Sequence, residues 1–267
     1  MRSTVLGAPA DILTKSEFLE EITKIIQSTQ KMKLLVTAYS EFYVQGTRDT
    51  DFLNIMRKAD LVTPDGVSVL AAVKYMNRAK GKSLGVRLGQ GIRVGSEILA
   101  GSVGETVTGV WLFENLTKMA EKNNWKVFLL GGWDGVCEKT ARMLLKRFPK
   151  LKLAYDAGET RVGTDEAINK RVLEKINDFA PDILFVAYNP IKQEKWLAKH
   201  QGQLKVKMGM GVGGTFDEYA GKIKKAPRWM ENMGLKWLWR VMIEPKRFGR
   251  IMRAVVVFPW LVFRDSK

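Results

Sequence analysis

The sequence alternates short runs of β-branched and other apolar residues with longer stretches of helical periodicity. The runs typical of buried strands cover residues 33–37, 59–63, 126–130, 151–154, 182–187 and 206–211. Helical patterns fall between them, near residues 52–56, 136–148, 165–179 and 193–200, and a helix capped by Ser16 precedes the first run. Strands that alternate with helices predict a parallel sheet with helices packed on its faces. We therefore expect an α/β fold.

One segment, residues 81–109, departs from this rhythm because it contains eight glycines. A connection so long and so rich in glycine is typical of a mobile loop or hairpin beside a functional site. We expect it to form such a loop rather than an element of the core.

The chain has 267 residues, 46% of them hydrophobic, which is enough for the core of one domain with or without a smaller appendage. Its first ten residues lack the apolar stretch of a signal peptide, and no other window is apolar enough over a sufficient length to span a membrane. We therefore expect a protein that is made and retained in the cytoplasm.

Cysteine and histidine each occur once, as Cys137 and His200. A single cysteine excludes an internal disulfide and a cysteine metal cluster, and a single histidine argues against a histidine-rich zinc site, so we expect no metal. We interpret His200 as a surface residue of a helix. Any catalytic base is then expected to be a carboxylate.

Positive charge is concentrated near the C-terminus. Residues 222–267 hold twelve basic and three acidic side chains, a net charge of +9 out of +16 for the whole chain. Such a local field favours a polyanionic partner: the phosphates of a nucleotide or lipid, an acidic membrane surface, or nucleic acid. A solvated surface helix is the alternative, since helix faces are commonly charged.

The same region carries an apolar stripe, in which Trp229, Met233, Trp237 and Val241 recur every four residues. It ends in ten apolar residues, 254–263, that include a proline and are too few for a bilayer span, which needs about 20. Apolar residues mixed with cations and tryptophans indicate an anchor at a membrane interface, although the stripe can also pack on the protein body. Nucleic acid is the weakest of the partners, because no recognised nucleic-acid module is present, and we expect none.

Candidate site residues follow the predicted strands, because ligands of open parallel sheets bind beyond the carboxyl ends of the strands. Thr37 and Asp65 close the two N-terminal strands. Glycine-rich turns at 131–135 and 211–217 can turn backbone N–H groups toward a phosphate, and polar side chains at 189–196 can contact a ribose or a base. Conformational explanations stay open, since Pro-Asp-Gly is a favoured turn and tight strand-to-helix turns need glycine in any case.

The chain also holds a series of short motifs in a fixed order. The most specific are Gly211-Val-Gly-Gly-Thr-Phe-Asp217, Ala220-Gly221, Lys225-Ala-Pro227, Gly234-Leu-Lys-Trp237, Arg240 and Glu244-Pro-Lys-Arg247. Others are Pro64-Asp-Gly66, Thr108-Gly-Val-Trp-Leu-Phe-Glu-Asn115, Gly131-Gly132 and Lys192-Gln-Glu-Lys-Trp196. In this order they resemble the WecB/TagA/CpsF family of bacterial glycosyltransferases, over nearly the whole chain.

The resemblance implies an inverting hexosyltransferase that needs neither metal nor cofactor. It would move an N-acetylmannosamine-type sugar from a UDP-sugar to a polyprenyl-pyrophosphate-linked acceptor in the synthesis of a cell-surface polysaccharide such as teichoic acid. A Rossmann-like core, residues 1–215, would bind the nucleotide, and a basic helical appendage, residues 216–267, would dock on the anionic surface at the cytoplasmic face of the membrane. The sugar, the acceptor, the linkage and the oligomeric state, a homo-oligomer included, stay open.

The resemblance also implies roles for individual residues. Asp65 would be the general base that deprotonates the acceptor hydroxyl, and Thr37 would line the donor site beside it. Arg240 and Arg247 would offset the charge of the leaving group. The implied substrate-binding residues are Tyr39, Gly109, Gly131, Gly132, Gln193, Glu194, Gly213, Gly214 and Asp217.

Three positions depart from the family pattern. Tyr39 stands where the family has asparagine, Trp111 where it has aspartate, and Thr106 where it usually has arginine. These changes fall in the implied acceptor and sugar pocket, whereas the C-terminal motifs are retained. An altered substrate explains this pattern, and so does the alternative of a catalytically impaired relative that binds nucleotide sugar or lipid pyrophosphate without transfer.

Overall fold

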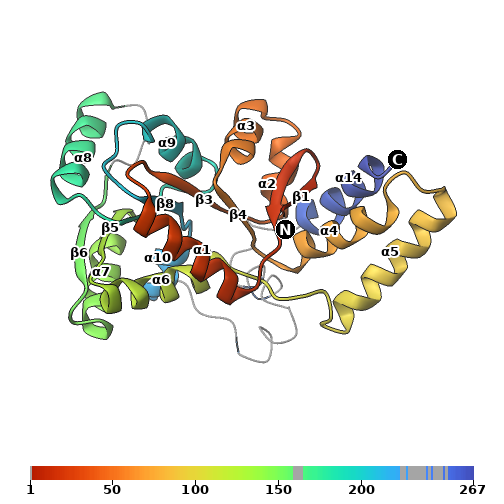
Figure 1. The fold of residues 1–267 in the computed structure, drawn as a ribbon, viewed down its shortest axis with the longest axis horizontal. Helices are drawn as coiled ribbons and strands as arrows, with labels where there is room; N and C mark the ends of the chain where they lie inside the picture. Colours follow the sequence, from red (N-terminus) through yellow and green to blue (C-terminus); the bar gives the residue numbers. More distant parts are fainter. Residues whose placement is uncertain are drawn as a thin grey trace.

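The structure, a computed structural model, describes residues 2–158, 165–222 and 252–267, together with Pro227, Trp239, Met242 and Gly249. It contains a six-stranded parallel sheet, in the order β4-β3-β8-β7-β5-β6. In Figure 1 the sheet runs from β6 at the left to β4 near the middle of the molecule. The strands are β3 (Lys33–Ala38), β4 (Leu61–Pro64), β5 (Lys126–Gly131), β6 (Lys152–Asp156), β7 (Ile183–Ala187) and β8 (Met208–Gly211). Each of the six predicted runs forms one of these strands, so the predicted parallel α/β sheet is confirmed.

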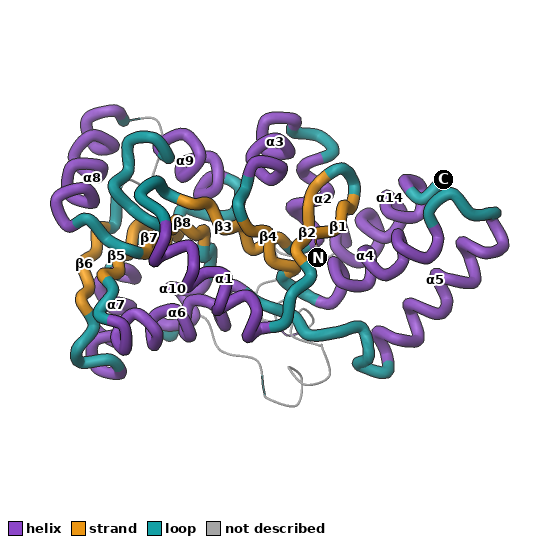
Figure 2. The backbone as a smooth tube through the Cα atoms, in the orientation of Figure 1, coloured by secondary structure: helices purple, strands orange, loops and turns teal. Residues whose placement is uncertain are grey.

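Helices cover both faces of the sheet (Figure 2). One apolar cluster joins the sheet to α2 (Ser40–Gly46), α3 (Thr50–Lys58), α4 (Val67–Ala79), α8 (Glu166–Phe179) and α9 (Lys192–His200). The other joins it to α1 (Lys15–Ser28), α6 (Gly109–Asn123), α7 (Val136–Arg147) and α10 (Thr215–Tyr219). Successive strand residues point to opposite faces, so Val36 packs in the first cluster and Leu35 in the second.

The N-terminal segment forms an antiparallel hairpin of β1 (Arg2–Val5) and β2 (Ala8–Asp11), followed by α1. The predicted cap of this helix, Ser16, is wrong: Thr14 occupies the position. The Thr14 hydroxyl accepts a hydrogen bond from the Glu17 N–H at 3.3 Å, and the Glu17 carboxylate accepts one from the Thr14 N–H at 2.7 Å. This reciprocal pair is favoured because Glu17 lies three residues after Thr14, the spacing of a capping box.

The glycine-rich segment is not a loop as expected, because most of it forms the helix α5 (Leu84–Leu99). Each glycine weakens a helix by about 1 kcal/mol relative to alanine. Packing against α4 and the C-terminal segment offsets that cost: Val94 is buried, and the long side chain of Arg87 is buried against Phe263 and Ser266. The helix lies along α4 at one end of the molecule (Figure 1).

His200 ends α9, as predicted for a helical residue, but it is buried and not on the surface. Its ring lies 4.8 Å from that of Trp196, one turn earlier on the helix. Burial lowers the pKa of His200, which favours the neutral imidazole. After His200 the chain turns, and the backbone N–H groups of Gln203 and Leu204 donate to the His200 carbonyl.

The C-terminal end packs on the body of the protein. A π-helical turn, η2 (Arg253–Val257), leads into α14 (Phe258–Asp265), which contacts α2 and α4. Phe258 and Val262 are buried, and the Phe258 ring lies 5.9 Å from that of Tyr43 in α2. Among the described residues, no helix has both the length and the apolar character to cross a membrane.

Candidate active site

A cavity of about 420 Å³ opens at the carboxyl edge of the sheet. The chain leaves β3 toward β4 at one edge and β5 toward β6 at the other, so the direction of winding changes between β3 and β5. Ligands of open α/β sheets bind at such a switch point. Residues at or after the ends of five strands line the cavity: Thr37 and Tyr39, Asp65, Gly132, Gln193, and Gly213 with Gly214 and Asp217. Of the residues predicted for the site, these eight and Gly109 meet here.

Asp65 is the first residue after β4 and is half-buried. Its Oδ2 accepts a hydrogen bond at 3.0 Å from the N–H of Gly109, the first residue of α6. The partial positive charge at a helix N-terminus favours a carboxylate in this place. The helix start is fixed in turn by the Thr108 hydroxyl, which accepts a hydrogen bond from the Trp111 N–H at 3.2 Å.

Gly109 also lies against Thr37. A Cβ atom at Gly109 would lie 3.3 Å from the Thr37 hydroxyl and 3.6 Å from Asp65 Oδ2. A larger residue would therefore push between the two side chains. Thr37, in β3, donates from its hydroxyl to the carbonyl of Gly211, the last residue of β8, at 3.4 Å. The three residues thus form one compact group at the cavity wall.

Gln193 and Glu194 begin α9, but only Gln193 lines the cavity. Glu194 is fully buried behind it: one carboxylate oxygen accepts from the Gln193 amide at 2.8 Å and the other from the Ile191 N–H at 2.6 Å. The Gln193 side-chain oxygen accepts from the Gly213 N–H at 3.1 Å. Burial raises the pKa of Glu194 to about 7, although the hydrogen bonds from Gln193 and Ile191 lower it. Glu194 therefore holds the wall of the cavity in place.

Gly131, the last residue of β5, and Gly132 after it allow close approach of other parts of the chain. A Cβ at Gly131 would lie 2.6 Å from the Ala187 carbonyl oxygen, and one at Gly132 would lie 2.9 Å from the Phe216 ring. Both also have positive φ, which disfavours any side chain. Gly132 lines the cavity, whereas Gly131 lies behind it, against β7.

Trp133 and Asp134, in the same turn, also line the cavity, and they were not predicted. The Trp133 ring stacks on Tyr188, with centroids 6.1 Å apart and planes 12° apart. The Asp134 carboxylate pairs with Lys222, another lining residue, at 3.5 Å. The sequence did contain a signal for both residues. A tight glycine turn requires neither an aromatic residue nor an acid, so their presence in this turn indicates another role.

Of the three residues that depart from the family pattern, only one lines the cavity. Tyr39 lines the cavity, and its hydroxyl donates to Glu41 at 3.4 Å. Thr106 and Trp111 are not among the lining residues, and the Trp111 ring faces the Lys15 ammonium at 5.4 Å.

Two predicted residues, Arg240 and Arg247, lie outside the described residues. Arg253, further along the chain, is described. It pairs with Glu41 at 2.9 Å, which connects the C-terminal segment to the first turn of α2, the helix that begins directly after Tyr39. Within residues 2–158, 165–222 and 252–267, no three histidine, cysteine or carboxylate side chains gather closely enough to hold a metal ion.

Comparison with known proteins identifies the family of the chain. A family model described as the glycosyl transferase WecG/TagA/CpsF family matches residues 3–86 and 75–267. An N-acetylglucosaminyldiphosphoundecaprenol N-acetyl-beta-D-mannosaminyltransferase of Staphylococcus aureus strain MRSA252 is 29% identical over 265 residues, 98% of this chain and 92% of the relative. Its counterpart in strain NCTC 8325 / PS 47 is 28% identical over the same shares. The chain therefore belongs to the WecG/TagA/CpsF family of glycosyl transferases.

Proposed function

We propose that the protein transfers an N-acetylmannosamine-type sugar from a UDP-sugar to a polyprenyl-diphosphate-linked acceptor, with inversion and without a metal or another cofactor. The observation that carries the proposal is the position of Asp65, whose carboxylate lies in the cavity beside Thr37 and the N-terminus of α6. The names of the two Staphylococcus aureus relatives, which specify a mannosaminyl transfer to a diphosphoundecaprenol-linked sugar, support the choice of substrates.

In the proposed reaction, Asp65 accepts the proton of the acceptor hydroxyl as that oxygen attacks the anomeric carbon of the donor. The bond from the anomeric carbon to the UDP oxygen breaks, and UDP leaves with the electron pair. Attack from the face opposite the leaving group inverts the configuration. The Gly109 N–H orients the carboxylate, so Asp65 needs little reorganisation during the transfer.

The nucleotide is proposed to lie along the glycine turns on the other side of the cavity. Gly132, Gly213 and Gly214 leave room for phosphates to approach the backbone, and Gln193 offers a polar side chain to the ribose or the base. Asp217 completes this wall. Arg240 and Arg247 are proposed to offset the negative charge that develops on the departing diphosphate.

The test is a transfer assay with UDP-N-acetylmannosamine and a polyprenyl-diphosphate-linked N-acetylglucosamine acceptor, on wild type and Asp65→Asn. The amide keeps the size of the side chain but cannot accept the proton. We expect kcat to fall by about 10²-fold or more. Undiminished turnover in Asp65→Asn would remove Asp65 as the base.

The same assay decides between transfer and binding alone. UDP that stabilises the wild-type protein against heating, with no transfer from a broad panel of UDP-sugars, would favour the catalytically impaired alternative. Tyr39 is the departure to examine in that case, because it lines the cavity.

A further inference from the structure

A second cavity, of about 380 Å³, lies between α4, α5 and α14. We call it the α4/α5/α14 groove. Its wall is almost entirely apolar and includes Ala71 and Tyr75 from α4, Val94 from α5, and Phe258 and Val262 from α14. A groove of this kind suits a hydrocarbon ligand, which gains free energy from leaving water and offers no polar group to satisfy.

Two glycines of α5 make room for the groove. A Cβ at Gly95 would meet no atom within 4 Å, and one at Gly91 would meet only the Tyr75 ring, at 3.9 Å. Both residues line the groove. Since they are four residues apart on a helix, their missing side chains leave a continuous trough along α5.

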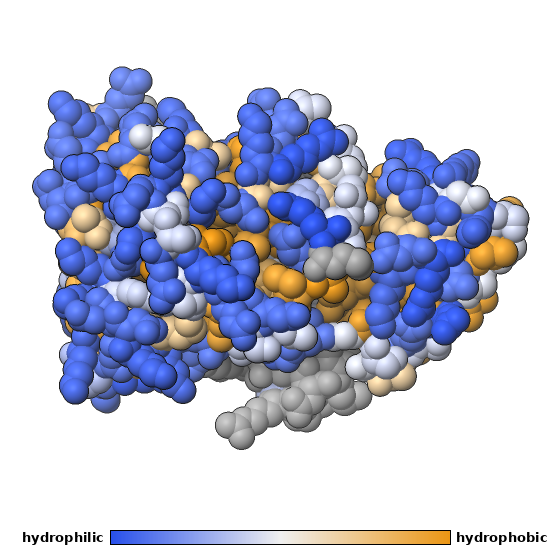
Figure 3. All heavy atoms as spheres, viewed as in Figure 1, coloured by the Kyte–Doolittle hydropathy of each residue, from blue (hydrophilic) through white to orange (hydrophobic). Residues whose placement is uncertain are grey.

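The outer surface of α5 continues the apolar character of the groove. Leu84, Leu88 and Ile92 recur every four residues and are 59%, 53% and 77% exposed. Gly91 and Gly95 follow Leu84 and Leu88 by seven residues, two helical turns, and so lie on the same side of the helix. Figure 3 shows hydrophobic residues exposed over α5 at the outer end of the molecule. Contiguous exposed apolar residues of this kind mark a binding surface.

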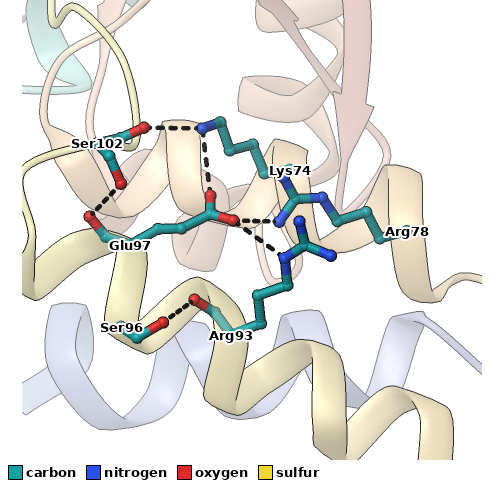
Figure 4. A network of polar contacts seen from close by, with 6 residues as sticks. All are labelled: Lys74, Arg78, Arg93, Ser96, Glu97 and Ser102. Carbon is teal, nitrogen blue, oxygen red and sulfur yellow. Dashed lines mark hydrogen bonds and ion pairs between the residues drawn. The ribbon is translucent and has the colours of Figure 1, made fainter.

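The walls of the groove are held by buried and half-buried polar contacts. Glu97 of α5 pairs with Lys74 and Arg78 of α4, at 3.2 and 2.6 Å (Figure 4). Arg87, also in α5, donates to Ser266 Oγ at 2.9 Å and to the Phe263 carbonyl at the end of α14. These contacts fix all three helices around the groove, which is therefore a preformed feature of the fold.

The groove begins close to the candidate active site. Ser68, in the first turn of α4, lines the groove, and Asp65, three residues earlier, lines the catalytic cavity. Charge around the groove also fits an anionic lipid: residues 80–99 and 252–267 contain seven basic and two acidic side chains. A ligand with a sugar diphosphate at Asp65 and a long hydrocarbon chain can thus occupy both cavities at once.

We propose that the α4/α5/α14 groove binds the polyprenyl chain of the lipid-linked acceptor. The first isoprene units contact Ser68 and Ala71, and later units follow the trough between α5 and α14. The inference rests on the proposed function, because the acceptor class comes from that proposal. It adds a binding site for the hydrocarbon part of the substrate, separate from the residues that contact the sugars.

The test fills the groove without disturbing the fold. Gly95→Leu places a side chain in open space inside the groove. Gly89→Leu is the matched control, because Gly89 is in the same helix, has no atom within 4 Å of an added Cβ, and does not line the groove. KM is measured for acceptors with an eleven-unit and a two-unit isoprenoid chain. We expect Gly95→Leu to raise the ratio of the long-chain to the short-chain KM by about tenfold, the effect of losing about two buried methylene groups, and Gly89→Leu to leave it unchanged.

A photoreactive undecaprenyl diphosphate provides a readout that needs no catalysis. We expect it to label peptides of α5 and α14 in wild type and Gly89→Leu, and to label them less in Gly95→Leu. Loss of labelling together with a changed KM ratio supports the groove. An unchanged KM ratio in an active enzyme, or equal labelling in the three proteins, would overturn the proposal that the groove binds the polyprenyl chain. Either result would leave the proposed transfer reaction intact. Labelling that is reduced only in Gly95→Leu, in a protein that shows no transfer, would support lipid binding in the groove and would contradict the proposed transferase activity.

Discussion

Glu194 shows how a single buried side chain can control the site without lining it. Its two oxygens hold Gln193 and the turn at Ile191, where φ is +73°. A Cβ at Gly211 would lie 2.3 Å from Glu194 Oε1, so the carboxylate packs directly against the backbone of β8. The motif that contains Glu194 was visible in the sequence. Its burial was not, because it depends on the approach of β8, which begins fourteen positions further along the chain, at Met208.

This burial predicts a pH dependence of stability. The pKa of Glu194 is about 7 in the folded protein and 4.5 without burial, so the folded protein binds this proton more tightly than the unfolded chain does. The resulting stabilisation is complete below pH 4.5 and is lost as the pH rises through 7, by about 3 kcal/mol. Glu194→Gln cannot titrate and should lose this slope between pH 5 and 8. Urea unfolding at several pH values measures it, and parallel curves for the two proteins would contradict the role of Glu194.

At the scale of elements, the strands were predictable and α5 was not. Strand runs carry their signal locally, because buried β-branched residues and the turns after them are adjacent in sequence. Asp65 and Thr37 could be placed at the site because each lies at the end of a strand that was itself predictable. The helix α5 depends on partners that are distant in sequence, namely Lys74 and Arg78 in α4 and the C-terminal residues that bind Arg87. Its glycine content alone predicted a loop.

Arg87 is predicted to fasten α14 to α5. Arg87→Met keeps most of the length of the side chain but removes the donors to Phe263 and Ser266 and the contact of the guanidinium with the Phe263 ring, 4.4 Å away. Hydrogen bonds to charged groups each contribute about 1.5–3 kcal/mol, so opening of α14 should become easier by about 3 kcal/mol. Hydrogen exchange of residues 258–266 measures this. Arg93→Met, which alters an exposed arginine of the same helix, is the control, and equal exchange in the two variants would disprove the fastening role.

For the molecule as a whole, charge and apolar surface are proposed to act together at the membrane. The chain carries a net charge of +16, and α14 presents Trp260, 61% exposed, on the side away from the buried Phe258 and Val262. Cations attract an anionic surface in a way that salt screens, whereas an inserted tryptophan contributes apolar burial that salt does not screen. The two contributions can therefore be separated by measuring vesicle binding at different ionic strengths.

Trp260→Ala should weaken binding to phosphatidylglycerol vesicles by about tenfold, at low and at high salt alike, because the loss is one of apolar burial. Raising the salt concentration should weaken the binding of wild type and variant by the same factor, since both keep every cation. Tyr155→Ala is the control, because Tyr155 is an exposed aromatic residue of β6, at the opposite edge of the sheet from β4. Vesicle co-sedimentation measures all three proteins. Equal binding by Trp260→Ala and Tyr155→Ala would mean that α14 faces water, and the anchor would then have to lie elsewhere in the basic C-terminal region.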